Sequence, residues 1–277
     1  MKRIVLFLSC LSVFSLSAFE LDIDMGGGAQ YTGAEGNLVY AKDTWKGSSA
    51  KIDHESSVNF YTWVNLETDQ AYWPKMRLEY SHIKTEGTSN MSVNSGNILI
   101  DTAIDLLNDK LIEIGIDLKD LTRNSRLDQS TYEAFLYYEY FEDTSFPTFG
   151  VGLGAKMFDF AYSATIIDGV DGLEFTDNGG ETVPLLFFKS RYELDKEDDS
   201  AQLSFEATGK VYLFGDSTIY DYMVKTDFMM QYNETTDIGF ELGYKASFYD
   251  IKGSDINTVG GDMSNSGIYV GLVGHFR

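Results

Sequence analysis

The sequence predicts an all-β fold: a transmembrane, antiparallel up-and-down β-barrel of about ten strands, with twelve or eight strands as alternatives. Segments of alternating apolar and polar residues recur along the chain at the length of ~9 to 11 residues that a tilted membrane strand needs. The connections between these segments are mostly long and short in turn, which is typical of such barrels. A soluble β-sandwich gives no reason to expect that alternation.

The chain begins with a segment typical of a secretory signal peptide. In residues 1–18, two basic residues precede an apolar stretch that ends in small residues, and cleavage is expected after Ser17 or Ala18. The one cysteine, Cys10, lies in this segment, so the mature chain has no disulfide or thiol chemistry. No later segment has the ~18 uninterrupted apolar residues of a transmembrane helix, so only a closed barrel would carry the exported chain through a membrane.

The composition excludes two classes of protein. The 43 Asp and Glu residues outnumber the 21 Lys and Arg residues, giving a formal net charge of −22. Nucleic acid is therefore not an expected partner, because phosphate binding needs a basic face. A disordered acidic chain is also excluded, because 43% of the residues are hydrophobic and could bury a core or meet lipid.

The first five predicted strands each have one apolar face, which we assign to lipid. In the first of them, Leu21 and Met25 alternate with Asp22 and Asp24, so the two faces differ in polarity. The lipid-facing positions are Leu21, Ile23, Met25, Ala29 and Tyr31 in 20–31; Val58, Phe60, Val64 and Leu66 in 57–67; Met76, Leu78 and Tyr80 in 74–82; Tyr132, Ala134, Leu136, Tyr138 and Tyr140 in 131–141; and Phe149, Val151, Leu153, Ala155 and Met157 in 148–158.

The last five predicted strands repeat this pattern more regularly. In the tenth, Gly274 is the only gap in an otherwise apolar face. The lipid-facing positions are Leu186, Phe188, Tyr192 and Leu194 in 184–194; Leu203, Phe205, Ala207, Val211 and Leu213 in 201–213; Tyr220, Tyr222, Val224, Phe228 and Met230 in 219–232; Ile238, Phe240, Leu242, Tyr244 and Phe248 in 237–248; and Ile268, Val270, Leu272 and Phe276 in 267–277.

Residues 19–277 form one predicted domain, with both ends of the barrel wall on the periplasmic side. The segment 98–121 is ambiguous, because it has helical spacing at first and strand-like alternation later. We expect an outer loop that folds a short helix or hairpin over the mouth, although a strand pair that makes the barrel twelve-stranded is the alternative. The expected long outer loops are 35–55, 87–126, 160–182 and 251–265.

The polar faces predict a nearly neutral interior in a strongly acidic protein. Paired charges would satisfy one another there, whereas an unpaired buried charge costs several kcal/mol. The surplus acid is therefore assigned to the loops, and a largely filled barrel is favoured over a wide charged channel. The predicted inward charges are the basic residues Lys75, Arg77, Lys156, Lys189, Arg191, Lys210, Lys225 and Lys245, and the acidic residues Asp22, Asp24, Glu79, Glu133, Glu139, Glu193, Glu206, Asp221, Asp227 and Glu241.

Bulky side chains add to the predicted filling of the interior. A barrel of about ten strands encloses little more space than the eight-stranded barrels that side chains fill. We therefore expect the lumen to conduct poorly. The other bulky inward residues are Tyr61, Trp63, Phe135, Tyr137, Phe141 and Tyr212.

No catalytic, cofactor or metal site is predicted. The histidines are His54 in the first long loop, His82 at the outer end of the third strand and His275 at the periplasmic end. Ser81 and His82 cannot form a dyad, because neighbouring residues of a strand point to opposite faces. The alternatives are a soluble periplasmic β-barrel that binds an apolar ligand, with its apolar faces turned inward, and an outer-membrane hydrolase.

Six segments carry a resemblance to a known family. In order they are YEAFLYYEYFED, FGVGLGAKMFD, VPLLFFKSRYEL, DSTIYDYMVKTDFMMQY, IGFELGYKASF and SGIYVGLVGHF. This series, from Tyr132 to Phe276, resembles small outer-membrane β-barrel proteins of Gram-negative bacteria with no assigned activity. The resemblance implies an integral outer-membrane barrel and carries no catalytic residues, and the first half of the chain matches only in strand pattern.

The last strand also resembles the assembly signal of outer-membrane barrels, with Tyr269 and Gly271 before the aromatic Phe276. Gly274 and the final Arg277 depart from that signal. We expect a monomer in the cell outer membrane, with a structural, narrow-passage or surface-binding role. The expected partners are outer-membrane lipid, lipopolysaccharide and the outer-membrane assembly machinery.

Overall fold

The computed structural model describes residues 21–42, 45–68, 70, 72–92, 122–141, 146–166, 174–194, 201–212, 217–251 and 259–277. The predicted signal peptide and the segment 98–121 lie outside these residues. None of the described residues forms a helix long and apolar enough to cross a membrane. The strands are β1 (Leu21–Lys42), β2 (Trp45–Thr68), β3 (Lys75–Ser92), β4 (Thr122–Tyr140), β5 (Thr148–Ile166), β6 (Glu174–Leu194), β7 (Ala201–Tyr212), β8 (Thr218–Asn233), β9 (Thr236–Ile251) and β10 (Val259–Phe276).

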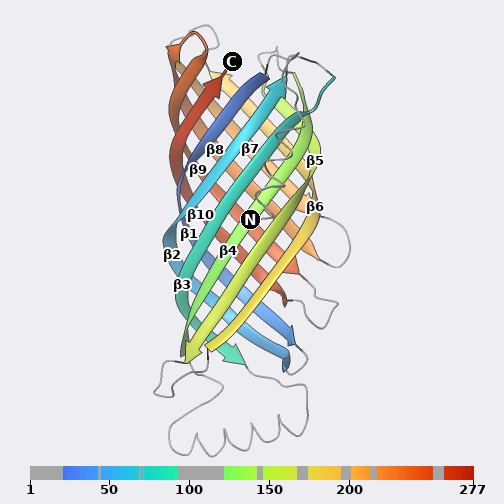
Figure 1. Ribbon diagram of the computed structural model, residues 1–277, viewed down its shortest axis with the longest axis vertical. Coiled ribbons are helices and arrows are strands. Elements are labelled where there is room, and N and C mark those ends of the chain that lie inside the picture. The colour runs from blue at the N-terminus through green and yellow to red at the C-terminus, as the bar shows by residue number, and fades with distance from the viewer. Residues whose placement is uncertain are drawn as a thin grey trace, which may run out of the picture.

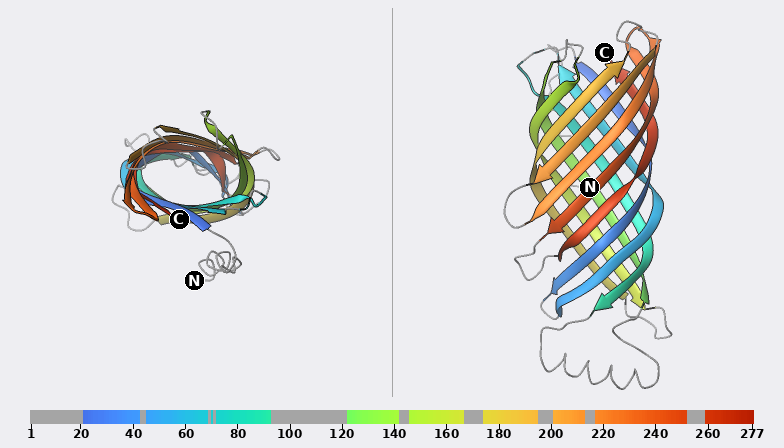
Figure 2. Two further views of the ribbon diagram at one scale, coloured as in Figure 1. Left: turned by 90° about the horizontal axis from the view of Figure 1, so that it is seen from above. Right: turned by 180° about the vertical axis from the view of Figure 1, so that it is seen from behind.

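The described strands form one closed antiparallel barrel in which each strand pairs with its neighbours in the chain (Figure 1). β1 pairs with β10 in a continuous register from Ile23 opposite Phe276 to Tyr40 opposite Val259, and this pairing closes the ring seen from above in Figure 2. The predicted ten-stranded up-and-down barrel is confirmed. The twelve-stranded alternative is wrong, because β3 pairs directly with β4. The eight-stranded alternative is also wrong, because all ten strands take part in the closed ring.

The strands are longer than predicted and extend into the segments assigned to outer loops. β1 runs to Lys42 and β2 starts at Trp45, so the expected loop 35–55 is almost entirely a paired hairpin. Backbone pairing continues beyond the apolar belt because it does not need an apolar face, and outward residues there, such as Glu35 and Asp53, are exposed. The same extension shortens three other predicted loops: 87–126 by β3 and β4, 160–182 by β5 and β6, and 251–265 by β10.

The predicted facing of the wall is confirmed for most of the described strands. Leu66, Met76 and Leu78 are exceptions: they were assigned to lipid but are buried together in one apolar cluster. Leu213 lies outside the described residues. Outward side chains form an apolar belt in which Leu242 is 61% and Leu272 60% exposed, whereas the inward Asn65 and Arg77 are fully buried. Rings gather at the belt edge nearer the long connections, where Tyr80 packs on Tyr132 with centroids 5.0 Å apart and other strands contribute similar pairs. An apolar belt edged by aromatic rings is the surface of a barrel that spans a bilayer.

One predicted inward residue is placed wrongly. β4 ends at Tyr140, and Phe141 adopts a positive φ of 69°, which turns the chain out of the strand. Its ring is 60% exposed and lies edge-on to Phe149, an outward residue of β5. The alternation that placed Phe141 inside therefore stops one residue before it.

We expect Phe240→Arg to lower the unfolding free energy by ~2 to 4 kcal/mol, because it places a charge on the lipid-facing side of β9, where Phe240 is 57% exposed. Urea unfolding in lipid vesicles measures the change. Glu35→Arg, on an outward position above the belt, is the control and is expected to change stability by less than about 0.5 kcal/mol. Equal effects of the two substitutions would contradict the position of the belt.

The barrel lumen as candidate functional site

The centre of the lumen is crossed by ion pairs between distant strands. Arg77 on β3 donates to Glu206 on β7 at 3.1 Å, and Lys210 on β7 donates back to Glu79 on β3 at 2.6 Å. In the strand order, β3 and β7 lie four places apart, so these bonds cross the interior. Lys210 also reaches Glu133 on β4 at 2.5 Å. We call these five side chains the central crossbar.

A second group of charges continues the network on both sides of the central crossbar. Lys156 on β5 donates to Asp221 on β8 at 2.6 Å and lies 3.4 Å from Glu133, which ties it to the crossbar. Lys225 contacts Glu241 at 3.2 Å. Glu241 in turn accepts hydrogen bonds from the Tyr61 hydroxyl at 2.6 Å and from the indole of Trp63. The Arg77 guanidinium lies 5.0 Å from the centre of the Trp63 ring, which connects this group to the central crossbar.

The energetics of burial explain why these groups pair so densely. Arg77 and Glu206 have fully buried side chains, and those of Lys156 and Glu133 are each 1% exposed. Taking a charge out of water costs several kcal/mol, which is recovered only through opposite charges and hydrogen bonds with good geometry. Removing one partner from such a pair typically costs ~3 to 5 kcal/mol. Separating the members of the central crossbar would leave buried charges without partners, and this cost keeps them together.

The short-turn end of the lumen holds a polar vestibule of about 310 Å³. Lys75 bridges Glu139 at 2.8 Å and Glu67 at 3.0 Å. Arg191 on β6 reaches towards Asp24 on β1, the strand directly opposite in the ring, at 4.0 Å. The vestibule thus carries both signs of charge, and its far side is bounded by Lys189, which lies 3.8 Å from Glu206 of the central crossbar.

Aromatic rings fill the space beside the charges. Phe135 and Phe187 are stacked with centroids 4.8 Å apart and belong to a buried cluster on β4, β5, β6, β8 and β9. Lys210 lies 5.0 Å from the centre of the Phe135 ring, and Lys225 lies 4.0 Å from that of Trp63. Such cation–π contacts are worth ~2 kcal/mol or more when desolvated. The rings therefore exclude water and also stabilise the cations.

Glycines let these rings lie flat against the wall. A Cβ on Gly154 would be 2.2 Å from the Phe135 ring and 2.2 Å from the Ala134 carbonyl oxygen, and one on Gly152 would be 2.5 Å from Cβ of Tyr137. The same relation holds between Gly26 and the Trp63 indole on the other side of the barrel. Gly152 and Gly154, in the GVGLG run of β5, thus leave room for the rings of β4, and we call these two residues the glycine floor.

The outer part of the lumen contains His54, which the sequence placed in a loop. Its side chain points inward from β2, is 4% exposed, and is hydrogen-bonded to Thr85 at 2.9 Å and Ser125 at 2.7 Å. A register shift after His54 changes which residues of β2 face inward, and a strict period of two cannot anticipate it. Burial lowers the pKa of His54, while the nearby charges of Asp53 and Glu86 partly offset this.

The sequence found most of the inward charges but missed part of the filling. All eight predicted basic residues are in ion pairs within the lumen, whereas the predicted inward acid Asp22 is exposed at its edge. Glu67 and Asp237 were missed although both lie on inward positions of the alternating pattern. The missed large apolar residues with buried inward side chains are Ile52, Ile83, Leu127, Phe158, Tyr162, Val183, Leu185, Phe187, Ile219, Met223, Met229 and Tyr249.

Ser81 and His82 face opposite sides of the wall, as predicted. Ser81 is buried and contacts Thr131 at 2.5 Å, whereas His82 is on the outer surface, with Nδ1 3.0 Å from the Ser130 hydroxyl. Asp128 approaches the same nitrogen at 3.7 Å. At the other end of the barrel, His275 bonds Asp24 at 2.5 Å beside the vestibule.

Together the closed barrel, the apolar belt and the charged interior define an integral outer-membrane β-barrel protein. No family model matches the sequence, and no curated protein matches it. The resemblance to uncharacterised small outer-membrane barrels therefore stays a prediction.

Solved structures that overlap the chain include a FadL homologue from Pseudomonas aeruginosa, at 13% identity and a TM-score of 0.30, which spans 95% of this chain; this chain covers only 65% of that one. OprG from the same organism has 10% identity and a TM-score of 0.33, and the match spans 92% of this chain and 96% of OprG. The transport unit of the autotransporter AIDA-I from Escherichia coli has 8% identity and a TM-score of 0.34, and the match spans 96% of this chain and 92% of that one. Similarity this low says nothing about the function of this chain.

We expect Gly154→Ala to destabilise the barrel by ~1 to 3 kcal/mol, because the added methyl group must displace the Phe135 ring or the β4 backbone. Gly209→Ala is the matched control: a Cβ there meets nothing within 4 Å, so stability is expected to stay the same or rise slightly. Urea unfolding of both variants in vesicles makes the comparison. A Gly154 variant as stable as the Gly209 variant would contradict the role of the glycine floor.

Acidification is expected to weaken the outer part of the barrel through His54. Because its pKa is lower in the folded state than the ordinary 6.5, the unfolded chain binds the proton more readily below that pH. The contribution of His54 to stability is thus complete above about pH 6.5 and falls as the pH decreases through that value towards its folded pKa. Urea unfolding of the wild type and of His54→Gln over a pH series isolates this term as their difference, and a difference that does not change with pH would contradict it.

Proposed function

We propose that this protein is a monomeric outer-membrane barrel whose lumen is a narrow passage, closed at rest by the central crossbar, and that it is not an enzyme. The observation that carries the proposal is the pair of opposed bonds between β3 and β7, from Arg77 to Glu206 and from Lys210 to Glu79. These bonds span the interior at its centre. A solute therefore passes only if they separate.

The charge pattern indicates what such a passage would admit. Each cation of the central crossbar is matched by carboxylates, so the separated groups would line a path with both signs of charge. Such a path favours water, small ions or small dipolar solutes over large or apolar ones. The polar vestibule at the short-turn end supports the same class, because its lining also carries both signs.

The two alternative functions are not supported by the geometry. A soluble barrel that binds an apolar ligand required the apolar faces to turn inward, whereas Phe240 and Leu272 face outward and Glu241 is buried inside. A hydrolase required a serine, a histidine and an acid in series. Ser130 and Asp128 both approach Nδ1 of His82, so the ring does not connect them through its two nitrogens.

The wild-type protein is expected to show small or no steady conductance in planar bilayers. Arg77→Ala removes one of the largest fully buried side chains among the described residues and leaves Glu79 and Glu206 with fewer cations. We therefore expect conductance to rise severalfold and to become cation-selective. Single-channel currents and reversal potentials in a salt gradient measure both effects.

Arg126→Ala is the matched control, because Arg126 lies on the outer surface with 45% of its side chain exposed. It should conduct like the wild type. Heat-modifiable migration on a detergent gel verifies that each variant is folded. Large, long-lived openings of the wild-type protein would contradict the closed lumen, and unchanged currents in a folded Arg77 variant would contradict the role of the crossbar.

A further inference from the structure

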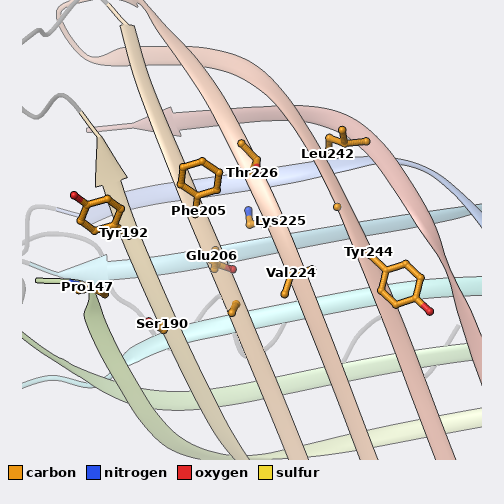
Figure 3. Close-up of a pocket in the computed structure, with 12 residues that line it drawn as sticks. Pro147, Ser190, Tyr192, Phe205, Glu206, Val224, Lys225, Thr226, Leu242 and Tyr244 are labelled. Atoms are coloured by element: carbon orange, nitrogen blue, oxygen red, sulfur yellow. The ribbon is translucent and has the colours of Figure 1, made fainter.

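A groove of about 490 Å³ is present on the outer wall, across β6, β7, β8 and β9. Figure 3 shows its larger side chains on the near face of the strands, with Glu206 and Lys225 behind them on the lumen side. Tyr192 and Phe205 border the groove on one side, and Leu242 and Tyr244 on the other.

The register explains why the wall is hollow at this place. Ala207 pairs with Val224, and Thr226 lies between Phe205 on β7 and Leu242 on β9. These short side chains are surrounded by large ones on the same face, so the surface sinks to the backbone between them. The depression is thus a fixed consequence of sequence and register.

We propose that this groove binds one acyl chain of a membrane lipid. Its outward lining is uncharged, and it opens within the apolar belt, so it is continuous with the surface that meets the hydrocarbon. Phe205, Leu242 and Tyr244 are 44%, 61% and 36% exposed, so they offer free apolar surface on the flanks of the groove. A flexible hydrocarbon chain gains dispersion contacts on three sides in such a groove and on only one side over a convex wall.

The groove extends along the height of the apolar belt. Tyr192 lies two residues before the end of β6, and Pro147 comes directly before the start of β5, so one end of the groove lies near the short turns. Short turns face the periplasm in outer-membrane barrels. This end of the groove therefore opens at the periplasmic edge of the belt, while Tyr244, whose ring is close to that of Tyr222, lies at the other end. This inference rests on the barrel and its belt, and it is independent of whether the lumen conducts.

Ala207→Phe fills the floor of the groove and tests the proposal. Wild-type and variant proteins are purified in detergent with added dipalmitoyl phosphatidylethanolamine, and the lipids that each retains are counted by native mass spectrometry. We expect the wild type to retain one lipid that the variant loses. Thr226→Phe fills the same floor from the next strand and should give the same loss. The matched control is Ala155→Phe, an outward position of β5 at a similar depth that is not part of the groove.

The outcomes separate the groove from general lipid contact. Loss of the retained lipid in the Ala207 and Thr226 variants but not in the Ala155 variant supports the proposal. Equal retention in all proteins, or equal loss in all three variants, overturns it. A dimer of the wild type that the Ala207 substitution converts to a monomer also overturns it, because a second copy of the chain would then be the occupant.

Discussion

The closed interior depends on the burial of charge. Arg77 cannot be left unpaired when its side chain is fully buried, so it holds Glu79 and Glu206, which in turn require Lys210 and Lys189 nearby. Each group is tolerated only because the next is present. The wall around them can then be thin, because one layer of strands is stabilised from inside by bonds that reach from one side to the other.

The rings and glycines serve the same constraint. Phe135 rests on Gly154 and brings its face to Lys210, so one aromatic side chain fills space and also lowers the cost of burying a cation. Trp63 does this for Lys225 while its indole binds Glu241, the carboxylate that Lys225 also contacts. The apolar and charged parts of the lumen are therefore one packed unit. A substitution in either part is felt in the other.

The sequence alone was sufficient for the parts of the fold that follow a period of two. Outward Leu242 and inward Glu241 are neighbours, and that contrast, repeated over ten segments, gave the barrel, its facing and nearly all of its inward charges. Features that depend on pairing across the lumen were not predictable, because nothing in the sequence shows which side chains of β3 and β7 meet inside the barrel. The inward position of His54 was missed because of a register shift, and the apolar filling around Phe187 was missed because two apolar faces on one strand give no contrast.

The first hairpin has a mechanical consequence. The apolar face of β1 ends near Tyr31, yet the strand continues to Lys42, paired with β10 to Tyr40 and with β2 throughout. At about 3.3 Å per residue and a tilt of about 40°, these residues rise roughly 25 to 30 Å above the apolar belt. A flexible loop of that length would collapse and sample many shapes, whereas a paired ribbon cannot. The cell would thus carry a stiff, elongated projection beyond the lipid headgroups, and whatever touches its tip would do so at a fixed height and orientation.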